Sequence, residues 1–245
     1  GFRASLGAAG FASRRRQRAA RWPAPRRKPR DADEPPVTPV AAPLPSHAEQ
    51  LAGLLAGLRD RPKHVAPRFL YDARGSQLFE RICELPEYYP TRTETAILRD
   101  NLGAIVESIG ERALLVEPGS GSSAKTRLLL DALPTLSGYV PVDISCEHLL
   151  RAAAGLAASY PAIEVLPVCA DFTADYPLPL PTRRPPARIV HFFPGSTIGN
   201  LERDAATALL ARLRDSAGRH GGLLIGVDLV KAPEVIERAY NDAAG

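Results

Sequence analysis

The sequence contains no methionine and one tryptophan, and no stretch is apolar for long enough to cross a membrane. Its three cysteines, Cys83, Cys146 and Cys169, are odd in number and lack metal-binding spacing. This predicts buried free thiols in a reducing compartment, hence a cytoplasmic location. The five histidines are scattered, so no metal site is expected. These shortages count against a membrane-spanning chain, a disulfide-stabilised secreted domain and a metalloenzyme.

Acidic residues are absent from residues 1–30, which hold ten Lys or Arg. Because the whole chain carries +4, the rest of it carries −6, and the basic character belongs to this tail. Residues 1–45 are rich in Arg, Ala and Pro and are predicted to be disordered. An organelle transit peptide, a nucleic-acid-binding arm and non-native sequence remain alternatives. The segment lacks interleaved aromatics, so no nucleic-acid partner is expected.

Residues 46–110 are predicted to form a helical cap. Ser46-x-x-Glu49 is a capping box that opens a first helix, and Thr91-x-x-Glu94 has the same form before a later one. Between these boxes, prolines 86 and 90 enclose a Glu-Tyr-Tyr loop.

Residues 111–245 alternate between apolar strand patterns and helical patterns. Strands are predicted over 113–116, 139–142, 164–170, 188–193 and 223–227, and helices over 125–133, 145–158, 203–217 and 233–243. Such alternation predicts an α/β fold with a mostly parallel sheet, whose ligand lies at the carboxyl ends of the strands.

The turn after the first strand is typical of a nucleotide-like cofactor site, because Gly119 and Gly121 expose bare backbone before a helix. A dinucleotide fingerprint fits if Ala124 replaces the third glycine, with Asp143 about 20 residues on. A phosphate loop fails, because Ala124 stands at the place of its second glycine. S-adenosylmethionine also fits, with Asp143 taking the ribose hydroxyls.

Glu117 discriminates between these cofactors. A carboxylate at the strand tip would repel a pyrophosphate, whereas the ammonium and sulfonium of S-adenosylmethionine favour one. A solvated strand end is the alternative interpretation of Glu117. Asp171 and Phe172 end the third strand, where an acid and an aromatic ring can bind adenine. Together, the residues at the ends of these three strands favour S-adenosylmethionine as the cofactor.

Four motifs resemble the histidine Nα-methyltransferases of ergothioneine biosynthesis. They are R-G-S-Q-L-F-E…L-P-E-Y-Y-P-T-R-T-E, V-E-P-G-S-G-S-S-A-K-T-R, F-P-G-S-T-I-G-N and G-V-D-L-V-K…A-Y-N-D-A-A-G. The resemblance covers about residues 64–245 and implies a class I, Rossmann-like methyltransferase sheet. It departs at Pro118, where the family usually has leucine.

The resemblance implies that Gly119, Lys125, Asp143, Asp171 and Phe172 hold S-adenosylmethionine. It implies that Tyr88, Asn200 and Tyr240 bind L-histidine, with Tyr71 near the transferred methyl group as a tentative catalytic residue. The implied reaction is trimethylation of the α-amine to hercynine. We expect the protein to be a monomer.

Neither end of the sequence looks natural, and the resemblance places the imidazole-binding residues and further strands beyond residue 245. We therefore expect a fragment with its C-terminal part missing, itself inactive. A methyltransferase for another amino acid or amine is the nearest alternative, and a non-catalytic binding fragment is the other.

Overall fold

The computed structural model of the protein describes residues 39–41, 44–121 and 124–241, all within the compact unit Pro35–Gly245. Its strands are β1 (Val40–Ala41), β2 (Ala113–Pro118), β3 (Gly138–Asp143), β4 (Glu164–Val165), β5 (Val168–Cys169), β6 (Arg188–Phe193) and β7 (Gly222–Ile225). Its α-helices are α1 (His47–Arg59), α2 (Ala73–Glu84), α3 (Tyr89–Asp100), α4 (Leu102–Ile109), α5 (Ala124–Ala132), α6 (Cys146–Ser159), α7 (Arg203–Ala217) and α8 (Pro233–Tyr240). Two 3-10 helices are η1 (Pro67–Leu70) and η2 (Thr197–Asn200).

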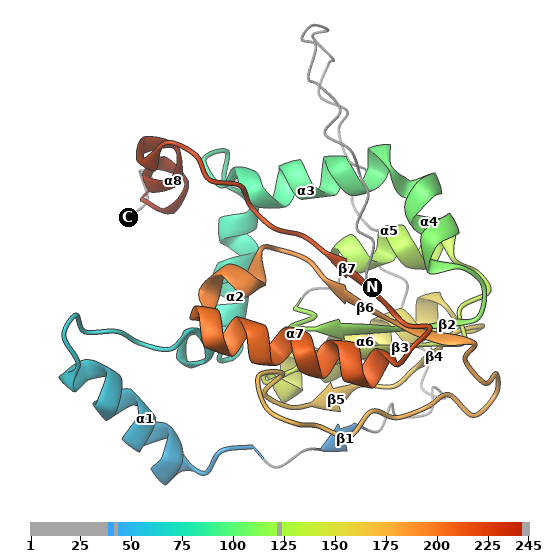
Figure 1. The fold of residues 1–245 in the computed structure, drawn as a ribbon, viewed down its shortest axis with the longest axis horizontal. Coiled ribbons are helices and arrows are strands. Elements are labelled where there is room, and N and C mark those ends of the chain that lie inside the picture. Colours follow the sequence, from blue (N-terminus) through green and yellow to red (C-terminus); the bar gives the residue numbers. More distant parts are fainter. Residues whose placement is uncertain (1–38, 42–43, 122–123, 242–245) are drawn as a thin grey trace, which may run out of the picture. The chain divides into compact units, whose positions relative to one another are not determined.

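The strands form one parallel sheet in the order β1-β5-β3-β2-β6-β7, with β4 also paired to β3 (Figure 1). Helices α4, α5 and α6 contribute to the core on one face of this sheet. Helix α7 packs with the end of β6 on the other face. The predicted α/β class with a parallel sheet is confirmed.

The centre of the sheet is β2, which lies between β3 and β6 and is buried at all six positions. Side chains alternate between the two faces of a strand, so Leu115 joins the cluster beneath α4 to α6, and Leu114 and Val116 join the opposite one. Burial of each leucine side chain stabilises the fold by roughly 1.5–3 kcal/mol. The continuous apolar run in the sequence therefore reports a strand covered on both faces.

The predicted strand over 164–170 is wrong in its continuity, because the structure divides it into β4 and β5. Pro167 lies between the two segments and has no N–H to donate to a neighbouring strand. Leu166 still donates its N–H to the carbonyl of Tyr139 at 2.9 Å, so the chain stays beside β3 through the break.

The segment predicted to be disordered contains a short strand. Val40 and Ala41 form β1, which pairs in parallel with Val168 and Cys169 at the edge of the sheet. Most of residues 1–45 lies outside the described residues, including the Arg-rich stretch. Within the described part, the expectation of disorder is wrong for residues 39–41. The boundaries of the cap (46–110) and the α/β domain (111–245) stay predictions.

The two expected capping boxes have different outcomes. Ser46 caps α1 as predicted, with Glu49 N donating to Ser46 Oγ at 3.3 Å and Ser46 N donating to Glu49 Oε2 at 2.7 Å. The second box is wrong, because α3 begins two residues before Thr91 and has Tyr88 at its N-cap without a side-chain bond. Pro90 in the first turn supplies a fixed φ angle suited to a helix start.

Two of the three cysteines are joined in the structure. Cys146, at the start of α6, forms a disulfide with Cys169, at the end of β5, and their Cα atoms are 5.2 Å apart. The prediction of three free thiols is therefore wrong for this pair, and Cys83 is free. No local pattern reveals this pairing, because the two segments are brought together by the pairing of β3 with β5.

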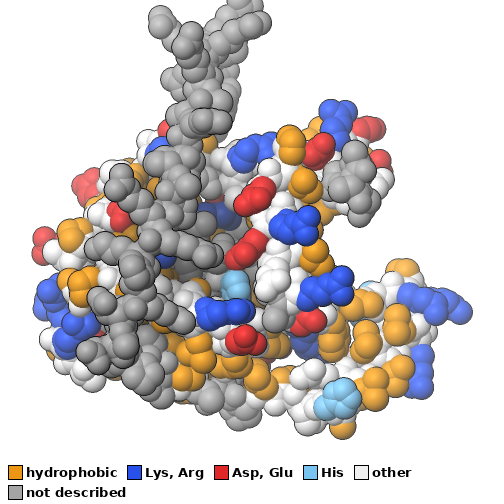
Figure 2. Space-filling view, turned by 180° about the vertical axis from the view of Figure 1, so that it is seen from behind, with side chains coloured by type: hydrophobic (Ala, Val, Ile, Leu, Met, Phe, Trp, Pro, Cys, Tyr) orange, Lys and Arg blue, Asp and Glu red, His pale blue; other side chains and the backbone are white. Residues whose placement is uncertain are grey.

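Helix α1 leaves apolar side chains uncovered: Leu51, Leu55 and Leu58 are exposed, and Figure 2 shows hydrophobic side chains gathered over this helix. None of the helices among the described residues combines the length and apolarity needed to span a bilayer.

Candidate active site

The candidate site is built on the tips of β2 and β3, where the glycine turn meets an acid. Gly119 and Gly121 have φ angles of 70° and 49°, which side-chain-bearing residues rarely adopt. The N–H of Gly119 donates to the carbonyl of Val142 at 2.8 Å, so the turn folds back over β3. Asp143 accepts from the N–H of Gly121 at 3.2 Å and from the N–H of Ser145 at 2.9 Å. The predicted pair of turn and acid is thus one connected unit.

Asp143 is half-buried at this position. Burial raises the pKa of its carboxyl, and the hydrogen bonds from the backbone of Ser145 and Gly121 oppose that rise. A carboxylate held between two backbone donors keeps further lone pairs for a ligand hydroxyl.

Asp171 and Phe172 lie beside the same turn, as predicted. A Cβ atom placed on Gly119 would lie 3.3 Å from the ring of Phe172, so the bare glycine lets the ring approach. Phe172 stacks edge-to-face on Phe193 at the tip of β6, with ring centroids 5.7 Å apart. Asp171 accepts from Thr173 Oγ1 at 2.6 Å and lies 3.7 Å from a guanidinium nitrogen of Arg68. The sequence interpretation missed this arginine.

Glu117 is wholly enclosed in the structure, with 2% of its surface exposed. Its Oε2 accepts hydrogen bonds from Thr126 Oγ1 and from Tyr139 OH, both at 2.5 Å. Burial raises its pKa to about 7, while these two hydrogen bonds lower it. The alternative interpretation, a solvated strand end, is therefore wrong.

A chain of aromatic rings joins the cap to α8. Tyr71 contacts Phe79, Phe79 contacts Tyr88 and Tyr88 contacts Tyr240, with ring centroids 5.9, 6.1 and 5.5 Å apart and edge-to-face geometry throughout. Tyr88 is 4% exposed, and burial raises the pKa of its phenol. Burial also raises the pKa of Tyr71, with a contribution from the nearby charge of Asp143. Tyr71, at one end of the chain of rings, therefore lies near enough to Asp143 to be affected by its charge.

These contacts bring three of the predicted residues together and leave one apart. Tyr71, Tyr88 and Tyr240 share the aromatic chain, although 67% of Tyr240 is exposed. Asn200 is exposed at the end of η2, and no contact among the described residues joins it to the rings.

Arg92 fixes the backbone of the loop that carries Tyr88. Its Nη1 donates to the carbonyls of Leu85 at 2.7 Å and Tyr88 at 3.2 Å, and its Nη2 donates to the carbonyl of Pro86 at 2.6 Å. One guanidinium thus joins three carbonyls across the turn from α2 into α3. The sequence interpretation missed this role.

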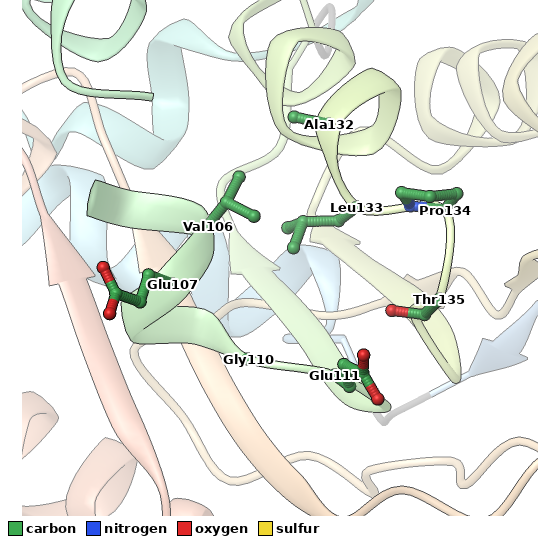
Figure 3. Close-up of a pocket in the computed structure, with 8 residues that line it drawn as sticks. All are labelled: Val106, Glu107, Gly110, Glu111, Ala132, Leu133, Pro134 and Thr135. Atoms are coloured by element: carbon green, nitrogen blue, oxygen red, sulfur yellow. The ribbon is translucent and has the colours of Figure 1, made fainter. Parts of the chain in front are cut away.

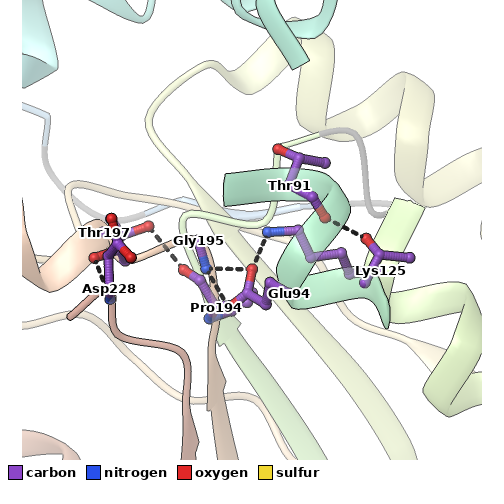
Figure 4. A network of polar contacts seen from close by, with 9 residues as sticks. Thr91, Glu94, Lys125, Pro194, Gly195, Thr197 and Asp228 are labelled. Carbon is purple, nitrogen blue, oxygen red and sulfur yellow. Dashed lines mark hydrogen bonds and ion pairs between the residues drawn. The ribbon is translucent and has the colours of Figure 1, made fainter. Parts of the chain in front are cut away.

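A polar network joins α3 to the strand tips (Figure 4). Glu94 accepts from the N–H of Gly195 with both carboxylate oxygens, at 2.8 and 2.9 Å, and pairs with Lys125 Nζ. Lys125, a predicted cofactor residue, is therefore held by an acid of the cap. At the start of α3, Tyr89 OH donates to Asp228, which also pairs with Lys231. Sequence reasoning missed Glu94 because it was assigned to a capping box.

The hollow in Figure 3 lies at the other end of the strands from the candidate site. It has a volume of about 340 Å³ and is lined by the end of α4 and the turn from α5 into β3, including Glu107, Glu111 and Thr135. Those segments precede β2 and β3, so the hollow lies at the amino ends of the strands, away from the candidate site. Among the described residues, no His, Cys, Asp and Glu cluster suits a metal ion.

Known proteins resemble this chain over most of its length. Histidine N-alpha-methyltransferase of Mycolicibacterium smegmatis is 44% identical over 194 residues, which covers 78% of this chain and 59% of that protein. The enzyme of the same name from Mycobacterium tuberculosis is 40% identical, covering 82% of this chain and 64% of that protein. Ergothioneine biosynthesis protein 1 of Neurospora crassa is 34% identical, covering 76% of this chain and 22% of that protein.

This chain accordingly spans about 60% of the length of the two bacterial relatives. The model of the family described as histidine-specific, S-adenosylmethionine-dependent methyltransferases matches residues 49–245. That match includes the glycine turn, the acids at the strand tips and the aromatic chain of the cap. The predicted cofactor, S-adenosylmethionine, agrees with the family, and the chain belongs to the histidine-specific, S-adenosylmethionine-dependent methyltransferases.

Proposed function

We propose that the protein binds S-adenosylmethionine at the tips of β2, β3 and β5 and methylates the α-amine of L-histidine, through three transfers, to hercynine. The observation that supports the proposal is the chain of ring contacts that joins Tyr71, Phe79, Tyr88 and Tyr240, together with the glycine turn and Asp143 at the strand tips. In this proposal the rings hold the amine and the strand tips hold the adenosyl group, and the charge of Asp143 contributes to the raised pKa of Tyr71. The names of the bacterial relatives favour histidine over another amine.

The described residues fit an adenosyl cofactor. Gly119 leaves bare backbone beside the ring of Phe172, where a side chain would crowd the turn. Asp143 would accept the ribose hydroxyls, Asp171 the adenine amino group, and Lys125 would take a carboxylate. S-adenosylmethionine has no phosphate, so it avoids the repulsion that a pyrophosphate would meet from the buried Glu117 at the end of β2.

When bound, S-adenosylmethionine supplies a methyl group on a sulfonium that is open to in-line displacement by an amine. The contribution of the protein is alignment of the two reactants. Before each transfer the substrate nitrogen loses one proton to water, and the neutral nitrogen then forms the new N–C bond while the S–CH3 bond breaks and S-adenosylhomocysteine leaves. The raised pKa values of Tyr71 and Tyr88 keep both phenols protonated at neutral pH, so they position and desolvate the amine as neutral groups. Desolvation lowers the pKa of the amine and increases its neutral fraction.

The test is mass spectrometry of the natural protein that carries this sequence, incubated with S-adenosylmethionine and each of the amino acids in turn. The expected product is histidine carrying three additional methyl groups. Methylation of another amino acid in preference to histidine would contradict the proposed substrate. Binding of S-adenosylmethionine without any methylated product would favour the alternative of a binding module.

Turnover by residues 1–245 is measured in the same assay, and cofactor binding is measured separately by calorimetry. Methylation of histidine by these residues would support the proposed function.

A further inference from the structure

Glu94 connects the cap to the proposed cofactor site. It lies on α3, in the cap, yet its carboxylate contacts two separate loops at the strand tips. One contact is the N–H of Gly195, which follows β6, and the other is Lys125 Nζ in the first turn of α5. Both contacts come from segments far away in sequence, with separations of 101 and 31 residues. Glu94 is thus a bridge between the cap and two loops of the sheet edge.

The surroundings of the carboxylate leave it little freedom. The side chains of Glu94 and Lys125 are each 17% exposed, so their attraction is screened less than that of a surface pair. A Cβ atom placed on Gly226 would lie 1.6 Å from Glu94 Oε1, so any residue larger than glycine there would displace the carboxylate. The glycine after β7 therefore makes room for the acid of the cap.

The ion pair with Glu94 affects ligand binding because the side chain of lysine is flexible. A lysine side chain has four flexible carbons, and a ligand that recruits it must offset the entropy of ordering them. Glu94 holds the ammonium in place before any ligand arrives and uses one of its three donors. It also orients the N–H of Gly195, a backbone donor beside the same ammonium: a Cβ on Gly195 would lie 3.6 Å from Lys125 Nζ.

We propose that Glu94 is a positioning residue for cofactor binding, which acts by holding Lys125 Nζ and the N–H of Gly195 in the orientation that the cofactor requires. This inference rests on the proposed function, because Lys125 must contact S-adenosylmethionine. Glu94 itself does not need to touch the cofactor.

The experiment is calorimetric titration of the chain with S-adenosylhomocysteine, the demethylated product, using Glu94→Gln, Lys125→Met and the double variant. Glutamine keeps the shape and an oxygen for the N–H of Gly195 but cannot pair with the ammonium. We expect Glu94→Gln to weaken binding about tenfold, because the lysine regains side-chain entropy that binding must remove. In the Lys125→Met background the same substitution should change the dissociation constant less than twofold, about the error of additivity.

Two further variants separate positioning from a general structural effect. Gly226→Ala should displace the carboxylate without removing its charge, and we expect it to weaken binding as Glu94→Gln does. Asp100→Asn, on the same helix and exposed, should bind like the parent. Urea denaturation of each unliganded variant records any loss of stability apart from affinity.

The outcomes are distinct. If the parent chain does not bind S-adenosylhomocysteine or S-adenosylmethionine, the proposed function fails. If the parent binds and Glu94→Gln binds equally well or more tightly, the inference about Glu94 fails alone. It fails too if the substitution weakens binding by the same factor with and without Lys125, since Glu94 would then act independently of the lysine.

Discussion

Replacement of the buried Glu117 by glutamine should change how stability depends on pH. The carboxyl is raised from an ordinary pKa of 4.5 to about 7, chiefly by burial. Its proton is therefore bound more tightly in the folded chain than in the unfolded chain. The contribution of Glu117 to the free energy of unfolding is most favourable below pH 4.5. It falls as the pH rises toward 7 and stays reduced above that value.

The size of the effect follows from the shift. Each unit of pKa difference corresponds to about 1.4 kcal/mol, so ionisation of Glu117 costs the folded state about 3 kcal/mol at pH 8. Glutamine cannot ionise, and its carbonyl oxygen can still accept from Thr126 and Tyr139. The unliganded variant should therefore be more stable than the parent at pH 8, by up to about 3 kcal/mol. At pH 4.5 or below this advantage should vanish.

The assay is urea denaturation of both proteins at several pH values between 4.5 and 8, without cofactor. The difference in unfolding free energy should grow across this range, while Glu107→Gln, at an exposed position, should follow the parent. A difference that does not vary with pH would refute the assignment of the raised pKa to Glu117. S-adenosylmethionine should favour the parent over the variant, because its ammonium stabilises the ionised carboxylate.

Three further predictions concern ligands. S-adenosylmethionine should raise the melting temperature whereas NAD and ATP should not, and Asp143→Ala should remove this protection; protection by NAD instead would contradict the cofactor. In the natural protein, Asn200→Ala and Tyr240→Phe should weaken histidine binding by roughly ten- to a hundredfold, as expected for a hydrogen bond to a charged group, and spare cofactor binding. Equal loss of both ligands, measured by calorimetry, would indicate a role in folding. Gly119→Ala should weaken cofactor binding, because residue 119 has a φ of 70° and the new methyl group would meet Phe172; unchanged affinity would contradict it.

The sheet and its tips could be predicted because their signals are local. An apolar run predicted β2, and residue types that suit turns and ribose placed Gly119 after β2 and Asp143 at the end of β3. Parallel pairing then brings the tips together without further information. The strand predicted over 188–193 has the same bounds as β6.

The remaining features depend on partners distant in sequence. The Thr91-x-x-Glu94 pattern satisfies the local rule for a capping box, yet Glu94 instead meets Gly195 and Lys125, which no local pattern reveals. Val40 and Ala41 pair with β5 although residues 1–45 have the composition of a disordered tail. In each case a tertiary contact outweighs a local preference.

The three carbonyl contacts of Arg92 bear on how substrate preference in this protein can change. The guanidinium binds three carbonyls between α2 and α3, so the backbone of this loop is held by contacts other than those of the Tyr88 ring. If Tyr88 contacts the substrate as proposed, a new side chain at position 88 would change that contact while the Arg92 bonds to the backbone remain. Lysine at 92 lacks the planar fork that joins several carbonyls. Directed evolution toward other amines would therefore hold Arg92 constant and diversify position 88.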